Sequence, residues 1–350
     1  MKNVNAYATH APEKKLEPYK IERRDPDPDD VEIEILYCGV CHSDIHTARG
    51  EWGGTKYPVV PGHEIVGKVT RVGSDVKKYK IGDTVGVGCF VDSCGHCENC
   101  KEGEEQYCLE GPTATYNSPS RFDKKVITFG GYSTHIVVKE DFVLSISDKL
   151  PLNAVAPLLC AGITTYSPLK HWNVKSGDKV AVVGLGGLGH MAVKLASSMG
   201  AEVTMLSRSP EKEQDASELG AAHFVLTTDP AEMKRISSSF NLIIDTVSAN
   251  HNYNDYLPLL KTNGTMVVLG IPPKASDVQA SKLISRRRSL VGSLVGGIRE
   301  TQEMLDYCAE NGIVSDVEMI NIDEINEAYE RTLNADVRYR FVIDMKSLKQ

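Results

Sequence analysis

The chain has 350 residues, of which 41% are hydrophobic and 25% charged, a composition typical of a globular protein of about two domains. A net charge of −8 with a pI near 5.7 argues against nucleic-acid binding, which needs a basic surface. No signal-peptide pattern and no apolar stretch near the ~20 residues of a membrane span is present, so we expect a cytoplasmic protein without a membrane partner, whose thiols stay reduced.

The first part of the chain, residues 1–150, is predicted to be rich in β-strands. Short alternating or apolar runs are separated there by Gly, Pro and Asp turns. One stretch inside it, Cys94–Cys108, is rich in Cys, Glu and Lys and poor in core-forming residues. The predicted strands are Val31–Tyr37, Ile65–Val72, Thr84–Val87 and Tyr132–Val138.

From about residue 178 onward, predicted strands alternate with predicted helices. This alternation implies a parallel sheet covered on both faces, and six such strands suit a doubly wound dinucleotide-binding fold. The alternation stops near Gly296, and the tail could rejoin the first domain. The strands are Lys179–Val183, Glu202–Leu206, His223–Leu226, Leu242–Thr246, Thr265–Leu269 and Leu290–Leu294; the helices are Leu188–Met199, Glu211–Leu219, Thr301–Glu310 and Ile325–Thr332; the last strand is Arg340–Met345.

Four cysteines with close spacing predict a metal site in the stretch Cys94–Cys108. Cys94, Cys97, Cys100 and Cys108 follow the pattern C-x2-C-x2-C-x7-C. Four thiolates can enclose Zn²⁺ tetrahedrally and leave no open position, which makes such a site structural. An iron–sulfur cluster is the alternative, and it is disfavoured because the fourth Cys lies too far along and no Pro follows it.

Three dispersed segments carry ligands for a second metal ion. A catalytic zinc needs three protein ligands and one exchangeable position, and Cys41, His63 and Cys160 would supply two thiolates and an imidazole. Glu64 is a candidate either to contact the ligands from outside the coordination sphere or to act as a transient fourth ligand. Taken singly, Cys160 is more often a small buried hydrophobe and His63 a satisfied polar residue. Nothing local in the sequence brings the three segments together.

A glycine-rich turn predicts the dinucleotide site. Gly184-x-Gly186-x-x-Gly189 follows the strand Lys179–Val183 and opens the next helix, the context in which this motif binds a pyrophosphate at a helix N-terminus. The alternative interpretation is a glycine-rich turn without a ligand.

The end of the second strand predicts the choice of cofactor. An NAD site commonly has an acid there, but this chain has Ser207-Arg208-Ser209-Pro210-Glu211-Lys212. Arg208 and Lys212 can pair with a 2′-phosphate, and the serines can donate hydrogen bonds, which favours NADP(H). Ser209 is also expected to cap the following helix, with Pro210 at its first position.

These motifs together resemble zinc-containing medium-chain dehydrogenases/reductases. Gly62-His63-Glu64, Cys41-x-Ser43, the cysteine lobe, Leu159–Tyr166 and Gly184–His190 stand in the family's order. Within that family the chain looks most like the cinnamyl-alcohol-dehydrogenase branch of NADP-dependent aldehyde reductases. The resemblance implies an α/β protein with a GroES-like β-rich catalytic domain, 1–154 and 296–350 with a structural zinc lobe at 90–112, and a Rossmann NADP-binding domain, 155–295.

The resemblance also implies roles for the site residues. Cys41, His63 and Cys160 carry over as ligands of a catalytic zinc, with Glu64 beside them, and the four-cysteine lobe carries over as a structural zinc site. Zinc would act as a Lewis acid on the substrate oxygen. Ser43 would contact that oxygen, and His46 would receive the proton through the ribose. On the residues alone, Ser43 could equally be a turn or cap residue and His46 a surface histidine.

The resemblance further implies an enzyme that interconverts primary alcohols and aldehydes with NADP(H), with two zinc ions per chain, acting on a small molecule as a homodimer. The alternatives are a polyol or sugar-alcohol dehydrogenase, a non-catalytic zinc- or nucleotide-binding relative and a zinc-free quinone reductase. The full ligand set argues against the quinone reductase, and Ser43 with the open ligand count argues against the non-catalytic relative. Trp52 is either a pocket wall or a core or interface aromatic, and Arg340 is a further candidate for contact with the pyrophosphate. Thr164, four residues after Cys160 and expected on the same helix, would border the nicotinamide. The expected cofactor contacts are Ser43, Thr164, Gly184, Leu185, Gly186, Gly187, Leu188, Gly189, Ser207, Arg208, Ser209, Lys212, Thr246, Gly270, Ser293, Leu294 and Val295.

Overall fold

The computed structural model describes residues 1–348, which divide into two units: Met1–Cys160 with Gly296–Gln350, and Ala161–Val295. Residues 349 and 350 of the predicted segment 296–350 lie outside the described residues. The first boundary between the two units falls after Cys160, whereas the predicted boundary falls after residue 154. The reason is that the helical segments Leu152–Val155 and Ala156–Leu159 pack on strands of the first unit.

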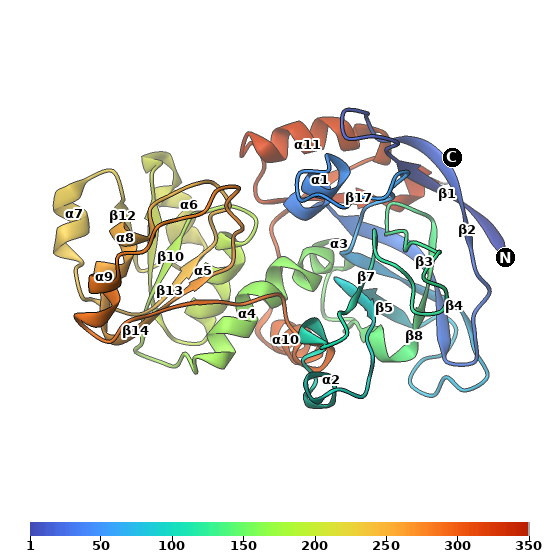
Figure 1. The fold of residues 1–350 in the computed structure, drawn as a ribbon, viewed down its shortest axis with the longest axis horizontal. Helices are drawn as coiled ribbons and strands as arrows, with labels where there is room; N and C mark the ends of the chain where they lie inside the picture. Colours follow the sequence, from blue (N-terminus) through green and yellow to red (C-terminus); the bar gives the residue numbers. More distant parts are fainter. Residues whose placement is uncertain (349–350) are drawn as a thin grey trace. The chain divides into compact units, whose positions relative to one another are not determined.

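The first unit is built on a seven-stranded sheet with the strand order β16-β17-β3-β4-β5-β9, in which β8 also pairs with β3. The last strand, β17, pairs with β3 in antiparallel register, so the red C-terminal segment lies beside the blue N-terminal strands in Figure 1. The tail therefore completes the sheet of this unit. The main strands are β3 (Asp30–Gly39), β4 (Ile65–Val72), β5 (Thr84–Val87), β8 (His135–Lys139), β9 (Leu144–Ser145), β16 (Val317–Ile320) and β17 (Arg340–Asp344).

Two short sheets and five α-helices complete the first unit. β1 (Lys2–Ala8) pairs with β2 (Glu17–Arg23). β6 (Phe90–Asp92) pairs with β7 (Thr113–Ala114), and this pairing brings together the two ends of the segment that contains the cysteine stretch. The helices are α1 (His42–Ala48), α2 (Glu98–Glu102), α3 (Leu152–Val155), α10 (Ile298–Asn311) and α11 (Ile325–Leu333).

The core of the first unit lies around β3 and β4. Ile33, Ile35 and Ile65 are fully buried there, together with Tyr132 and Phe341. Burying each such side chain contributes roughly 1.5–3 kcal/mol to folding. The core fixes β3 and β4, and these strands in turn hold the segments that follow or precede them, 40–42 and 61–64.

The second unit is a parallel sheet of six strands in the order β12-β11-β10-β13-β14-β15 (Figure 1, green to orange). Numbered along the chain this is the 3-2-1-4-5-6 order of the dinucleotide-binding fold. Its central strands are continuous apolar runs, as expected where both faces of a sheet are covered. The strands are β10 (Lys179–Val183), β11 (Glu202–Ser207), β12 (His223–Leu226), β13 (Phe240–Asp245), β14 (Leu260–Val268) and β15 (Ser289–Gly292); the helices are α4 (Ala161–His171), α5 (Gly189–Ser198), α6 (Glu213–Glu218), α7 (Pro230–Arg235), α8 (Tyr253–Tyr256) and α9 (Ala280–Ile284).

Several predicted elements differ in extent from those observed, most by one to three residues, and β14 starts at Leu260, five residues before the predicted Thr265. β8 begins at His135 rather than Tyr132, because Tyr132 is hydrogen-bonded to Pro61 and Tyr7, outside the β3 ladder. The predicted helix Glu211–Leu219 starts as a 3-10 turn, Pro210–Lys212, before α6. Within residues 1–348, no helix is both long and apolar enough to span a membrane.

Candidate functional site

The three dispersed segments meet inside the first unit. Cys41 directly precedes α1, His63 and Glu64 directly precede β4, and Cys160 directly follows the 3-10 turn Ala156–Leu159. All four side chains are buried, and one ligand atom of each lies within 4.8 Å of the others. The Sγ atoms of Cys41 and Cys160 are 3.9 Å apart. Two sulfurs and one imidazole in one buried group have the chemistry of a zinc site with a free fourth position, and the Glu64 carboxylate lies beside them.

Asp44, to which the sequence analysis gave no role, holds this cluster together. Its Oδ1 accepts hydrogen bonds from the Gly62 N–H (3.0 Å) and lies 3.1 Å from Nδ1 of His63. Its Oδ2 accepts from the Cys41 N–H (2.9 Å) and from the Tyr132 hydroxyl (3.3 Å). This carboxylate fixes the tautomer of His63, so that Nε2 carries the free lone pair for a metal ion. The negative charge of Asp44 also stabilises a positive charge on the His63 imidazole, whether that charge comes from a proton or from a bound metal ion.

Asp44→Asn is expected to weaken zinc binding at this cluster by about 10- to 100-fold, because an amide cannot match the charge of the carboxylate at Nδ1 of His63. Competition with a chelator measures this affinity. Asp92→Asn is the matched control, since Asp92 is a buried aspartate of the same unit that pairs with Lys139 instead. Equal zinc affinity in the wild type and Asp44→Asn would contradict a positioning role.

Glu64 is the fourth member of the cluster and pairs with Arg340. Both side chains are buried, and Oε1 of Glu64 accepts from Nη2 of Arg340. Burial raises the pKa of Glu64 to about 7, although the charge of Arg340 opposes the shift. Oε2 has no partner among residues 1–348, so it is available to a cation in the cluster. Arg340, considered in the sequence analysis for the pyrophosphate, has Glu64 as its partner in this structure.

The two predicted relay residues lie on α1, close to Cys41. The Oγ of Ser43 is 3.7 Å from the Sγ of Cys41, so its hydroxyl borders the ligand cluster. His46 is paired with Glu51 through Nδ1, and its ring lies 4.9 Å from that of Trp52. Trp52 is about half exposed and stacks on His46, so it is not a core aromatic.

The four cysteines of the stretch 94–108 also converge. Their four Sγ atoms lie within 4.8 Å of one another, and all nine cysteines of the chain, which all lie within residues 1–348, are free thiols. The Sγ of Cys100 is 3.4 Å from that of Cys97 and 3.8 Å from that of Cys94. Backbone N–H groups of Cys94 and Cys97 point at sulfurs of the group, at 3.4 and 3.3 Å. A closed set of four sulfurs fits structural zinc.

The glycine-rich turn in the second unit has the geometry that its sequence predicts. Gly184 has φ +89°, where an added Cβ would clash with Val247, and a Cβ at Gly189 would lie 1.9 Å from the Gly184 carbonyl oxygen. At Gly186 an added Cβ would meet nothing within 4 Å, which leaves open space above the turn. Thr246 braces the turn through hydrogen bonds from its Oγ1 to the carbonyls of Val183 (2.8 Å) and Gly184 (3.0 Å).

A cavity of about 160 Å³ adjoins this turn and contains the residues predicted to select the cofactor. Ser207, Arg208, Ser209 and Lys212 all line it. Lys212 donates from Nζ to the Leu185 carbonyl (2.8 Å), which holds its ammonium group beside the glycine-rich turn. Arg208 is exposed to solvent. A 2′-phosphate in this cavity would therefore face two cations, Arg208 and Lys212. β11 ends in a serine, so no acidic side chain stands there to repel the phosphate.

Two details of the nucleotide region differ from the sequence analysis. Ser209 precedes the turn Pro210–Lys212, but its side chain makes no capping hydrogen bond; instead its N–H donates to Oγ of Ser207 at 3.1 Å. Thr164 is not on the same helix as Cys160, because α4 begins at Ala161, after Cys160.

The other expected cofactor contacts lie at strand ends of the second unit. Gly270 follows β14, and an added Cβ there would lie 2.3 Å from the Val247 carbonyl oxygen, so close packing by itself explains this glycine. Ser293, Leu294 and Val295 follow β15, and Val295 has φ +48°. The carboxyl ends of β10, β11, β13, β14 and β15 thus all carry predicted contact residues, as in other open parallel sheets that bind nucleotides.

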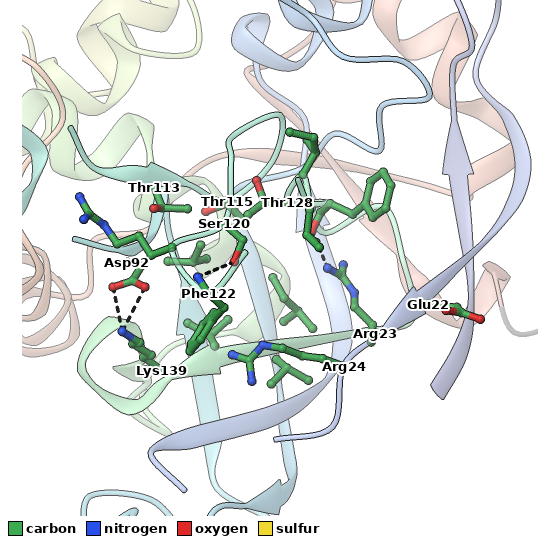
Figure 2. Close-up of a pocket in the computed structure, with 18 residues that line it drawn as sticks. Glu22, Arg23, Arg24, Asp92, Thr113, Thr115, Ser120, Phe122, Thr128 and Lys139 are labelled. Carbon is green, nitrogen blue, oxygen red and sulfur yellow. Dashed lines mark hydrogen bonds and ion pairs between the residues drawn. The ribbon is translucent and has the colours of Figure 1, made fainter. Parts of the chain in front are cut away.

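A second cavity, of about 150 Å³, lies in the first unit (Figure 2), and none of the clustered metal ligands lines it. Two of its cations are paired with carboxylates of the protein: Lys139 with Asp92, and Arg24 with Asp30. Arg23 donates to carbonyl oxygens and to the Ser133 hydroxyl. The ring of Phe122 lies under the cations of Arg24 and Lys139, at 4.4 and 5.1 Å. This cavity has the contacts of a structural region rather than of a reactive site.

Comparison with known protein families agrees with this geometry. Residues 27–148 match the model "Alcohol dehydrogenase GroES-like domain", and residues 187–310 match "Zinc-binding dehydrogenase". An NADP-dependent alcohol dehydrogenase C of Mycolicibacterium smegmatis is 57% identical over 350 residues, which cover 100% of both chains. The chain belongs to the zinc-containing medium-chain dehydrogenase/reductase family. Its GroES-like and Rossmann-type parts confirm the predicted fold class of this family.

Other members of the family are similar along the whole chain. The aldehyde reductase YahK of Escherichia coli is 56% identical over 351 residues, covering 99% of each chain. The structure of a cinnamyl alcohol dehydrogenase from Sorghum bicolor matches with a TM-score of 0.96 and 45% identity, covering 99% of this chain and 98% of that one. A Helicobacter pylori enzyme of the same name, complexed with NADP(H), matches with a TM-score of 0.93 and 44% identity, covering 98% of each chain. The chain therefore lies in the cinnamyl-alcohol-dehydrogenase-like branch of the medium-chain dehydrogenases/reductases.

Proposed function

We propose that this chain is a zinc-dependent oxidoreductase that interconverts primary alcohols and aldehydes by hydride transfer with NADP(H). The observation that carries the proposal is the buried convergence of Cys41, His63 and Cys160, because two thiolates and one imidazole are the ligand set of alcohol dehydrogenase zinc. The names of the similar M. smegmatis and E. coli proteins, an alcohol dehydrogenase and an aldehyde reductase, support it. Aromatic and aliphatic aldehydes are the proposed substrates, with reduction as the main direction.

Each chain is proposed to hold two zinc ions. Cys41, His63 and Cys160 would hold the catalytic ion, with Glu64 beside them, and three protein ligands would leave the ion open to a substrate oxygen; Cys94, Cys97, Cys100 and Cys108 would hold the structural ion. When bound, zinc polarises the oxygen of the alcohol or aldehyde, and the nicotinamide exchanges a hydride with its carbon. The protein orients the imidazole through Asp44 and keeps all four side chains of the catalytic cluster away from bulk water.

NADP(H) is the proposed cofactor because Arg208 and Lys212 face the same cavity and no acid ends β11. The backbone N–H groups at the start of α5 would bind the pyrophosphate over the open side of Gly186. The cofactor named in the M. smegmatis enzyme and bound in the H. pylori structure supports this assignment.

Ser43 and His46 are proposed to carry the substrate proton, Ser43 from the substrate oxygen and His46 by way of the ribose. Ser43→Ala is expected to lower alcohol oxidation by about 100-fold, because a positioned proton-transfer group contributes roughly 10²–10⁴. His46→Ala is expected to lower it less. His10→Ala is the control, an exposed histidine that also pairs with a carboxylate. Unchanged rates in both Ser43→Ala and His46→Ala would remove the relay from the mechanism.

The decisive test of the proposed function combines metal analysis with an aldehyde panel. We expect two zinc ions per chain and oxidation of NADPH with benzaldehyde or cinnamaldehyde, but no reaction with sorbitol. Turnover of sorbitol would instead indicate a polyol dehydrogenase. A fully metallated protein that is inert toward every alcohol and aldehyde would indicate a binding protein that kept the fold.

A homodimer in the cytoplasm is the proposed state of the protein. β15 is the edge strand of the parallel sheet, and in residues 1–348 no further strand pairs with its outer side, which suits pairing with a second copy. Ile271 and Ile284, in the segments around this strand, are exposed apolar side chains. A reducing compartment would keep the zinc-ligand thiols in the state that binds metal.

A further inference from the structure

A histidine not considered in the cofactor site lies in the wall of the proposed phosphate cavity. His251 follows β13 and lines the same cavity as Arg208 and Lys212. Its Nδ1 lies 2.8 Å from the carbonyl oxygen of Ala249, and its Nε2 lies 2.9 Å from Oδ2 of Asp245. A carbonyl and an ionised carboxylate can only accept hydrogen bonds, so both ring nitrogens must donate. Only the imidazolium form can do this.

The surroundings of His251 favour its charged form. Asp245 ends β13, is fully buried, and accepts a second hydrogen bond through Oδ1 from the Val247 N–H at 3.2 Å. Burial lowers the pKa of His251, but the hydrogen bonds to Asp245 and Ala249 outweigh it and leave the pKa raised, with Arg208 opposing. The edges of Tyr253 and Tyr256 pack against the ring at 5.0 and 5.8 Å. The charged groups that face the imidazole are therefore Asp245 and Arg208.

We infer that His251 is a positioning residue that sets NADP(H) affinity by neutralising Asp245 at the edge of the 2′-phosphate cavity. Both N–H groups of the ring are bound to the protein, so the imidazolium acts through its charge and not through a hydrogen bond to the cofactor. Once the ring loses its proton, the buried carboxylate stays uncompensated and repels a phosphate held by Arg208 and Lys212. The inference rests on the proposed use of NADP(H).

The sign of the resulting pH dependence follows from the charge. His251 is protonated below its raised pKa, so NADPH binding is strongest there and weakens as the pH rises through that value. NADH has no 2′-phosphate, so its affinity changes much less. The 2′-phosphate itself loses its second proton near ~6, so measurements well above that pH separate its titration from that of the protein.

The test is fluorescence titration of the zinc-loaded protein with NADPH and with NADH. At pH 7, His251→Gln is expected to weaken NADPH binding by about tenfold and NADH binding by less than about twofold, and to lose the decline of NADPH affinity with rising pH. The double variant His251→Gln/Asp245→Asn removes both charges and is expected to recover NADPH affinity to within about threefold of wild type. A merely structural histidine would show no such recovery.

His223→Gln is the matched control, because His223 also pairs with a carboxylate at 2.9 Å, that of Glu202, but is exposed and lies outside the cavity. Its affinities for both cofactors are expected to match wild type. Equal losses for NADPH and NADH in His251→Gln, or no recovery in the double variant, would overturn the inference. A wild type that binds NADH as tightly as NADPH would instead overturn the proposed cofactor, and the two failures are thereby distinguishable.

Discussion

Cys160→Ser is expected to lower the zinc content from about two ions per chain to about one and to reduce aldehyde turnover by at least ~10³-fold. The hydroxyl of serine keeps the size of the side chain but is a poor zinc ligand, because it is not ionised near neutral pH as a bound thiolate is. Losing the polarising ion removes several kcal/mol of transition-state stabilisation, and each 1.36 kcal/mol is a factor of ten in rate. Metal analysis and steady-state kinetics on the same preparation measure both effects.

The control for this substitution is Cys308→Ala. Cys308 is a fully buried thiol of the first unit, on α10, whose sulfur lies 3.6 Å from Sδ of Met304 and belongs to neither sulfur cluster. This variant is expected to keep both zinc ions and its turnover, with only a lower stability. Circular dichroism of both variants separates loss of the metal from loss of the fold. Full turnover by Cys160→Ser with one zinc ion per chain would refute the proposed catalytic site.

Arg208→Asp is expected to weaken NADPH binding by about 100-fold while NADH binding changes only a few-fold. A charge-assisted hydrogen bond to a phosphate contributes roughly 1.5–3 kcal/mol, and the new carboxylate adds repulsion. NADH lacks the 2′-phosphate, so the substitution neither removes a hydrogen bond from it nor adds this repulsion. Direct titration of the protein with both cofactors gives the ratio of dissociation constants.

Arg235→Asp provides the matched charge reversal. Arg235 is an exposed arginine at the end of α7 in the same unit and does not line the cavity. Its variant carries the same change in net charge, so it reports the long-range effect of charge alone on cofactor binding. Similar losses for NADPH and NADH in Arg208→Asp would show that Arg208 does not select the 2′-phosphate.

The elements best predicted from the sequence are those with a strong local pattern. β4, β5, β10 and β12 have the bounds that their apolar runs and flanking turns predict. The short helix α1 was not predicted, because its residues were interpreted only as parts of a ligand motif and its length gives a weak periodic signal. β1 and β2 were also missed, since Val4, Ala6 and Ala8 alternate with polar residues but include small side chains.

The candidate site was predictable in its ligands but not in its supporting groups. Cys41, His63 and Cys160 were selected through family resemblance, because no local rule joins residues so far apart in the chain. Asp44 carries one local signal, an acid at the third position of a helix, where it can accept from the preceding N–H groups. Its contact with His63 depends on the packing of α1 against the segment before β4. His251 had no signal in the sequence, since its role depends on the end of β13.

The pairing of Glu64 with Arg340 has a consequence for biogenesis. Glu64 lies in an early segment, whereas Arg340 begins β17 and is synthesised 276 residues later. Until that strand docks beside β3, a nascent chain would have to enclose an acidic side chain without its counter-cation, or leave it hydrated. We therefore expect the zinc-ligand cluster to reach its observed form only after β17 has docked, and chains terminated before residue 340 would contain every predicted zinc ligand but lack the counter-cation of Glu64.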